Sequence, residues 1–218
     1  DAERIAHRVG QVLSEPFHLG DDEVFVTAST GIAFTVAPAV ASDLLRDADA
    51  AMYQAKEHGR DRFEVFDRKM RAEAVDRLSI ENSLRKAIER RELRIHYQPK
   101  VDLRTGAIIG AEALLRWEHP DRGLLLPGEF IRVAEESGLI VPIGRWVLDQ
   151  AVRQAQRWHA EVPGLAPLYI CVNLSRRQLG DPHLVDDVAA VLEDTGIDPG
   201  LIDLEITESV LMDDVELA

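Results

Sequence analysis

The sequence has 218 residues, 46% hydrophobic and 29% charged, which is usual for a globular chain of one or two domains. Its formal net charge of −14 argues against polymeric nucleic acid or an anionic membrane as a partner, because their phosphates would be repelled. The single cysteine, Cys171, excludes an intrachain disulfide and a thiolate zinc cluster. We therefore expect a cytoplasmic segment without membrane contact, and no apolar run reaches the roughly 18 residues of a membrane span.

The first part of the chain alternates between helical and strand patterns. Apolar residues at helical spacing predict helices, and a run rich in β-branched and aromatic residues predicts a strand. The predicted order is helix, strand, helix and strand, at residues 2–14, 23–36, 42–59 and 62–66. Residues 67–91 contain neither Gly nor Pro, and we expect them to form a helix connecting two domains.

The second part of the chain repeats strand and helix with short connections. Strands are predicted at residues 93–103, 107–117, 168–175 and 201–209, and helices at 128–138, 143–161 and 183–196. This alternation favours an α/β fold with a parallel sheet, which is either doubly wound or closed into a barrel.

Three predicted strands carry polar residues where a buried parallel strand is normally apolar, namely Glu112, Asn173 and Glu205. Burying them costs several kcal/mol unless they are paired or bind a metal. Barrel active sites lie at the carboxyl ends of strands, and oxygen ligands of this kind suit Mg²⁺ or Mn²⁺. Spacing alone does not separate a metal site from a hydrogen-bonded polar cluster in the interior.

Four motifs in order carry a resemblance to a known family: YQP, EALLRW, VNLS and EITES, at residues 97–99, 112–117, 172–175 and 205–209. From about Glu81 onward the chain resembles EAL-domain phosphodiesterases, which hydrolyse cyclic di-GMP with Mg²⁺ or Mn²⁺ in a modified (β/α)₈ barrel. Residues 92–218 would be the first half of that barrel. The resemblance implies metal ligation by Glu112, Asn173 and Glu205, contacts to the dinucleotide by Gln98 and Arg116, and a catalytic role for Glu208 in ordering the loop at the site.

Residues 1–66 resemble the C-terminal part of a GGDEF domain through ASTGIA at 28–33 and DADAAMYQAKEHGRDRF at 47–63. The segment GDDEVF at 20–25 is not the GGDEF signature, because it follows the first helix and lacks the second glycine that lets a nucleotide approach. We therefore expect part of a tandem GGDEF–EAL protein.

A complete EAL domain would continue into a DDFGTG strand and into later strands that supply a Lys, a Glu and a Gln. These 218 residues are therefore expected to be incomplete for catalysis on their own. Two alternatives to a phosphodiesterase stay open: a module that binds cyclic di-GMP without cleaving it, and a diguanylate cyclase with a passive EAL domain. The helix at 67–91 is a candidate homodimer contact, and a membrane tether upstream is compatible with the cytoplasmic segment.

Overall fold

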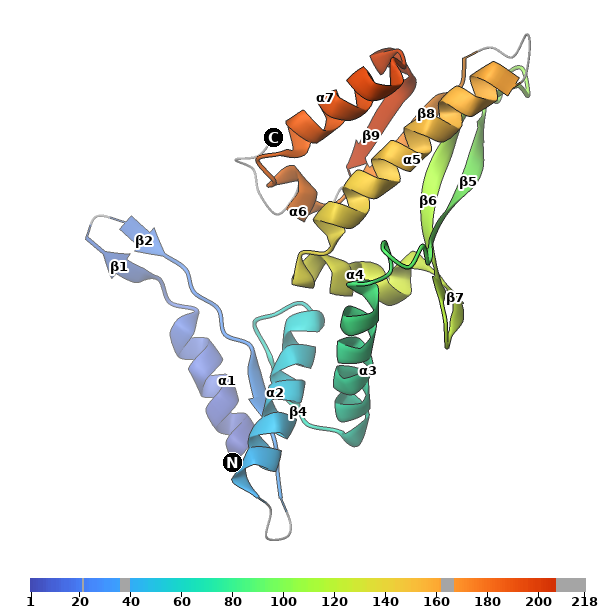
Figure 1. The fold of residues 1–218 in the computed structure, drawn as a ribbon. Coiled ribbons are helices and arrows are strands. Elements are labelled where there is room, and N and C mark those ends of the chain that lie inside the picture. Colours follow the sequence, from blue (N-terminus) through green and yellow to red (C-terminus); the bar gives the residue numbers. More distant parts are fainter. Residues whose placement is uncertain (21, 36–39, 162–166, 207–218) are drawn as a thin grey trace. The chain divides into compact units, whose positions relative to one another are not determined.

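A computed structural model describes residues 1–20, 22–35, 40–161 and 167–206 (Figure 1). The chain divides into two compact units, residues 1–79 and 80–218, and each is described by itself below. Within the described residues, no helix combines the length and the apolar character needed to cross a bilayer.

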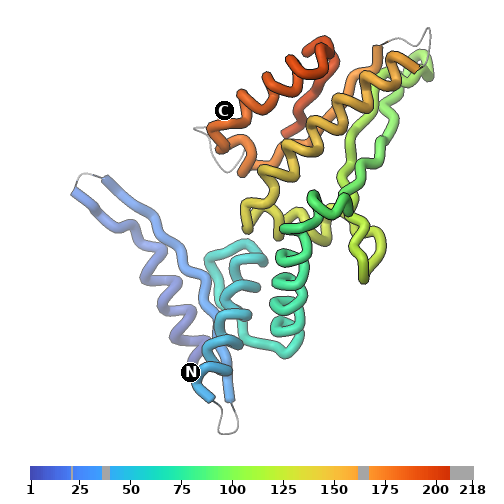
Figure 2. The backbone as a smooth tube through the Cα atoms, viewed as in Figure 1, coloured from blue at the N-terminus to red at the C-terminus, as the bar shows by residue number. Residues whose placement is uncertain are grey.

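The N-terminal unit contains two small sheets and two helices before the connecting helix. Strands β1 and β2 form an antiparallel hairpin, and strands β3 and β4 pair in parallel beside α2. Figure 2 follows this backbone in blue, from α1 through the hairpin to α2. The bounds are α1 Ala2–Leu13, β1 Phe17–Leu19, β2 Asp22–Val24, β3 Thr30–Ile32, α2 Ala41–Glu57 and β4 Phe63–Val65.

The single strand expected at residues 23–36 is wrong, because the structure contains two separate short strands there. A strand requires a partner ladder, and β2 and β3 pair with different partners. Between them, the described residues 25–29 belong to no strand, and the side chains of Phe25 and Val26 are exposed.

The connecting helix is shorter than the sequence predicts. Helix α3 spans Arg68–Leu84, and residues 85–91 form turns instead of continuing it. Backbone bonds there tighten to three-residue spacing, as from Ala87 N–H to Leu84 C=O (3.1 Å), and Arg91 adopts a φ of 56°. The guanidinium of Arg94 donates to the freed carbonyl of Arg91 (2.6 Å), so the chain turns directly into the next strand.

The C-terminal unit is built on a five-stranded sheet in the order β5-β6-β8-β9, with β7 paired to β6. The parallel arrangement expected throughout is wrong for β5, because β5 and β6 are antiparallel while β6–β8 and β8–β9 are parallel. Only residues 102–107 join β5 to β6, and a parallel crossover needs about a dozen. The bounds are β5 Leu93–Val101, β6 Ile108–His119, β7 Gly123–Leu125, β8 Tyr169–Leu174 and β9 Ile202–Ile206.

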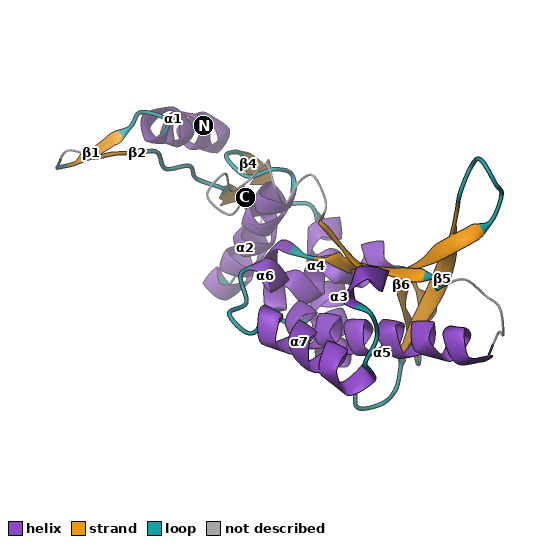
Figure 3. Cartoon of the chain, turned by 90° about the horizontal axis from the view of Figure 1, so that it is seen from above, coloured by secondary structure: helices purple, strands orange, loops and turns teal. Residues whose placement is uncertain are grey.

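Helices cover one face of this sheet, and the side chains between the helices and the sheet form the hydrophobic core. Figure 3 shows the long helix α5 beside strands β5 and β6, and Figure 1 shows α7 next to α5. The largest side chains with almost no exposure include Trp117, Phe130, Ile143 and Ile170. The bounds are α4 Pro127–Ser137, α5 Ile140–Glu161, α6 Arg176–Leu179 and α7 Leu184–Thr195, with a short 3₁₀ turn at Pro199–Leu201.

Alternation along the strands separates an apolar face from a polar face. Ala111, Ala113 and Leu115 of β6 are buried in the core. Glu112, between the two alanines, and Arg116, which follows Leu115, are only half-buried. Because side chains alternate with a period of two, these two residues point to the opposite face from the core. The polar face defined in this way carries the site residues.

The contact between α5 and α6 depends on Gly144. Gln178 is 5% exposed, and its Oε1 accepts hydrogen bonds from the backbone N–H (3.1 Å) and the hydroxyl (3.0 Å) of Ser175. A Cβ at Gly144 would lie 1.9 Å from Nε2 of Gln178. We expect Gly144→Ala to lower the free energy of unfolding by about 1–3 kcal/mol, because Gln178 would have to leave its buried position.

The matched control for this variant is Gly128→Ala on α4, where an added Cβ meets nothing within 4 Å. There the loss of backbone freedom in the unfolded chain makes the change neutral or slightly stabilising. Urea denaturation followed by circular dichroism measures both variants. Equal unfolding midpoints for Gly144→Ala and the wild type would contradict the packing described for α6.

Candidate functional site

Glu112 and Asn173 meet on the polar face of the sheet. Glu112 lies next to the end of the segment of β6 that pairs with β8, directly opposite Cys171, and Asn173 lies two residues further along β8. The side-chain Nδ2 of Asn173 donates to Oε1 of Glu112 at 2.7 Å. Asn173 is also the register partner of Glu205 on β9. The three residues therefore occupy one face of three neighbouring parallel strands.

The carboxylate of Glu205 forms an ion pair with the ammonium of Lys100, which comes from β5. Two residues earlier on β8 and β9, on the same face, the thiol of Cys171 donates to Oδ2 of Asp203 at 3.6 Å. The pKa of Glu205 is lowered, chiefly by its bond with Lys100. The pKa of Lys100 is raised, first by the Cys171 thiol and then by Glu205. In this corner of the polar face, Lys100, Cys171 and Glu205 therefore shift one another's pKa values.

Cys171 is fully buried, and burial is the main cause that raises the pKa of its thiol to about 11. At pH 8 only about one thiol in a thousand would be ionised, and the thiolate is the reactive form. We expect iodoacetamide to leave Cys171 unlabelled in the native protein and to label it after unfolding, as measured by peptide mass spectrometry. Rapid labelling of the folded protein would contradict this placement.

The remaining predicted site residues are placed less closely together. Gln98 lies directly opposite Glu112 in the β5–β6 ladder, so it shares the polar face. Arg116 lies four residues further along β6, about 13 Å away at strand rise, and its Nη1 donates to the carbonyl of Leu115 (2.7 Å). Glu208 lies outside the described residues. The structure therefore brings Glu112 and Asn173 into contact and pairs Glu205 with Lys100.

The sequence reasoning missed Lys100, although a signal for it was present. Lys100 stands two residues after Gln98, so the period of a strand places both on the same face. Among the described residues, no group of three or more His, Cys, Asp or Glu side chains is arranged to hold a metal. The predicted ligands Glu112, Asn173 and Glu205 do not form a group of this kind, because Asn173 is an amide.

A cavity of about 500 Å³ opens beside the site, and Asn173 is part of its lining. Its walls are largely apolar and come from β6, α4 and α5, with Leu114, Ile131 and Ile143 among them. Glu135 also lines it, and burial is the main cause that raises the pKa of this carboxyl. Apolar walls with a few polar groups are typical of small-molecule sites.

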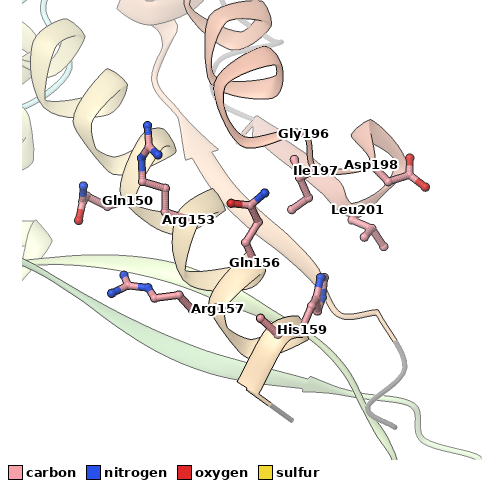
Figure 4. A pocket seen from close by; sticks show the side chains of 10 residues that line it. Gln150, Arg153, Gln156, Arg157, His159, Gly196, Ile197, Asp198 and Leu201 are labelled. Carbon is pink, nitrogen blue, oxygen red and sulfur yellow. The ribbon is translucent and has the colours of Figure 1, made fainter. Parts of the chain in front are cut away.

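A second pocket of about 950 Å³ lies between the C-terminal part of α5 and the segment leading into β9 (Figure 4). Its polar side chains support local structure: His159 Nε2 accepts from the backbone N–H of Leu168 (2.8 Å), and Gln156 donates to the Thr195 carbonyl. It lies where strands β8 and β9 begin, whereas Asn173 and Glu205 lie near the ends of those strands. We therefore place the candidate site at the other end of the sheet.

Comparison with known proteins gives the family of this arrangement. The EAL domain family matches residues 81–217, which include every strand of the five-stranded sheet. The chain belongs to the EAL domain family. Residues 1–62 match the diguanylate cyclase GGDEF domain, so the EAL domain follows part of a GGDEF domain.

Curated relatives match this chain along almost its whole length. The bifunctional diguanylate cyclase/cyclic di-GMP phosphodiesterase MucR of Pseudomonas aeruginosa is 44% identical over 217 residues, covering 99% of this chain and 31% of MucR. The cyclic di-GMP phosphodiesterase PdeR of Escherichia coli is 43% identical over 219 residues, covering 99% and 32%. The chain therefore spans about a third of the length of these relatives.

Solved structures of EAL proteins share the fold of the C-terminal unit. The PaMucR phosphodiesterase in complex with c-di-GMP is 48% identical with a TM-score of 0.60, covering 63% of this chain and 55% of that one. The EAL enzyme Bd1971, bound to cAMP and cyclic di-GMP, is 32% identical with a TM-score of 0.58, covering 67% and 40%. The α/β fold expected from the sequence, a GGDEF tail followed by a partial EAL barrel, is confirmed.

Proposed function

We propose that the protein carrying this chain hydrolyses cyclic di-GMP to the linear dinucleotide, with the site on the polar face of the EAL domain. The observation that carries the proposal is the 2.7 Å contact between Glu112 and Asn173, with Glu205 as the next register neighbour. The phosphodiesterases MucR and PdeR, which are 44% and 43% identical to the chain, support the same reaction.

A divalent cation is part of this proposal, and the donor set fits one. Two carboxylates and an amide oxygen, from Glu112, Glu205 and Asn173, are hard oxygen donors on three adjacent strands. They would hold Mg²⁺ or Mn²⁺, which when bound supplies water activation and neutralises negative charge on the reacting phosphate.

In this reaction one phosphodiester P–O bond breaks, the hydroxyl of water joins phosphorus and its proton goes to the released ribose oxygen. We propose that Gln98 and Arg116 contact the dinucleotide, with the guanidinium of Arg116 as a charged donor to phosphate. Glu208, by the same proposal, orders the loop at the site.

The cavity of about 500 Å³ supports a nucleotide as the ligand. Its apolar walls suit the faces of a purine ring, and the Glu135 carboxyl offers acceptors for the edge of guanine, which carries an N–H₂ donor. Of the three proposed metal ligands, Asn173 lines the same cavity, so a base bound there would place its phosphates near Asn173. We further propose a cytoplasmic location and a homodimer contact along the connecting helix α3.

The test is an assay of the full-length protein with cyclic di-GMP and Mg²⁺ or Mn²⁺, with products separated by ion-pair chromatography. The proposal predicts a linear dinucleotide that disappears when the metal is chelated. If the folded protein binds cyclic di-GMP without forming product, it is a binding module instead. If it forms cyclic di-GMP from GTP and never consumes it, the EAL domain is passive.

A further inference from the structure

The side chain of Lys100 crosses the sheet to reach Glu205. Lys100 stands opposite Gly110 in the β5–β6 ladder, and the register shifts between Lys100 and Val101. An irregularity of this kind re-aims the neighbouring side chain. In this case the ammonium is directed over β6 and β8 to β9, where the carboxylate lies 105 residues later in the sequence.

Gly110, opposite Lys100 in the ladder, leaves room for the ring of Tyr169. A Cβ at Gly110 would lie 2.8 Å from ring carbons of Tyr169, so the absence of a side chain lets that ring lie against β6. The ammonium of Lys100 is 6.0 Å from the centre of the Tyr169 ring, within the range of a cation–π contact. The ring of Tyr169 therefore helps to hold the ammonium of Lys100 on the polar face.

The ion pair that results is partly shielded from solvent. The Lys100 side chain is 30% exposed and that of Glu205 is 38% exposed, so water does not fully screen their attraction. Glu205 is also one of the three residues proposed to hold the divalent cation. The carboxylate of Glu205, which would have to bind the metal, is therefore already paired with the ammonium of Lys100.

We propose that Lys100 is a positioning residue that holds the Glu205 carboxylate in place before metal binds and competes with the metal for it. The inference rests on the proposed function, because it requires Glu205 to be a metal ligand. It has two consequences of opposite sign. Without metal, Lys100 stabilises the domain by pairing with Glu205; with metal, its positive charge lies beside a second cation and weakens binding.

The direct test is Mn²⁺ binding to the full-length protein without nucleotide, followed by the electron paramagnetic resonance signal of free Mn²⁺. Mn²⁺ binding that is lost in the Glu205→Gln variant is assigned to this site. We expect Lys100→Met, with Lys100→Gln as a second neutral variant, to bind Mn²⁺ about fivefold more tightly than the wild type. Lys100→Arg keeps the charge and should retain the wild-type affinity.

The control is Lys86→Met, which removes the same charge from an exposed position outside the sheet and should leave Mn²⁺ affinity unchanged. A second readout is thermal unfolding of the EAL domain. In chelator the neutral Lys100 variants should unfold at a lower temperature than the wild type. Saturating Mn²⁺ should raise their unfolding temperature by more than it raises that of the wild type.

The outcomes separate this inference from the function on which it rests. Equal Mn²⁺ affinity in the wild type and both neutral variants would overturn the role of Lys100 and leave the phosphodiesterase proposal standing. Weaker binding in the neutral variants would also overturn it. An absence of Mn²⁺ binding dependent on Glu205, in protein shown to be folded by circular dichroism, would overturn the metal site and the proposed function together.

Discussion

Replacing Glu112 with glutamine in the full-length protein is expected to lower the rate of cyclic di-GMP hydrolysis at least ~100-fold, because an amide cannot supply the negative charge of a metal ligand. Glutamine keeps the size of the side chain and still offers an oxygen to Nδ2 of Asn173, which donates to Glu112 at 2.7 Å. The free energy of unfolding should therefore change little. Initial rates at saturating Mg²⁺ measure the effect.

The matched control is Glu89→Gln, the same chemical change at an exposed position in the turns before β5. It should leave both the hydrolysis rate and the unfolding midpoint unchanged. A Glu112→Gln variant that folds normally and retains more than a third of the wild-type rate would contradict a ligand role for Glu112. Raising the Mn²⁺ concentration should restore part of the lost rate if the defect lies in metal affinity.

The largest effect on stability is expected from Trp117→Ala. Trp117 has no exposed surface, contacts the rings of His119 and Phe130 edge-on, and donates from Nε1 to the Glu92 carboxylate at 3.1 Å. Its removal leaves a large cavity in the core and takes this donor from the largely buried carboxylate of Glu92. We expect the free energy of unfolding of the C-terminal unit to fall by about 3–5 kcal/mol, measured by urea denaturation.

Trp117→Phe separates the packing contribution from the hydrogen bond. Phenylalanine fills much of the cavity but cannot donate to Glu92, so we expect a smaller loss, of about 1–2 kcal/mol. Circular dichroism is the suitable probe, because both variants remove a tryptophan from the fluorescence signal. A Trp117→Ala variant within about 1 kcal/mol of the wild type would show that this core is not the main source of stability.

The helices and long strands of the EAL domain were predictable because their patterns are local. The apolar period of the segment at 143–161 identifies α5, which begins three residues earlier at Ile140. The hairpin strand β1 and strand β7 were not predicted, because each has three residues and depends on its partner for stability. The antiparallel pairing of β5 and β6 was also missed, because strand periodicity is the same in both directions.

The site was predictable in part for the same reason. Glu112 and Asn173 are 61 residues apart in the sequence, and their contact follows from the parallel pairing of the strands on which they lie. The pairing of Lys100 with Glu205 requires the direction of β5 and the register shift at its end, and neither is visible in the residue pattern. Charged contacts that depend on such non-local geometry need a structure.

The proposed metal and nucleotide site is tested most directly by a crystal structure of the full-length protein with Mn²⁺ and cyclic di-GMP, with the metal located by its anomalous scattering. We expect Mn²⁺ on the polar face, bound by oxygens of Glu112, Asn173 and Glu205, with a phosphate of the dinucleotide beside it. Lys100 should then be displaced from the Glu205 carboxylate. An Mn²⁺ ion bound elsewhere, or a dinucleotide phosphate remote from these three residues, would contradict it.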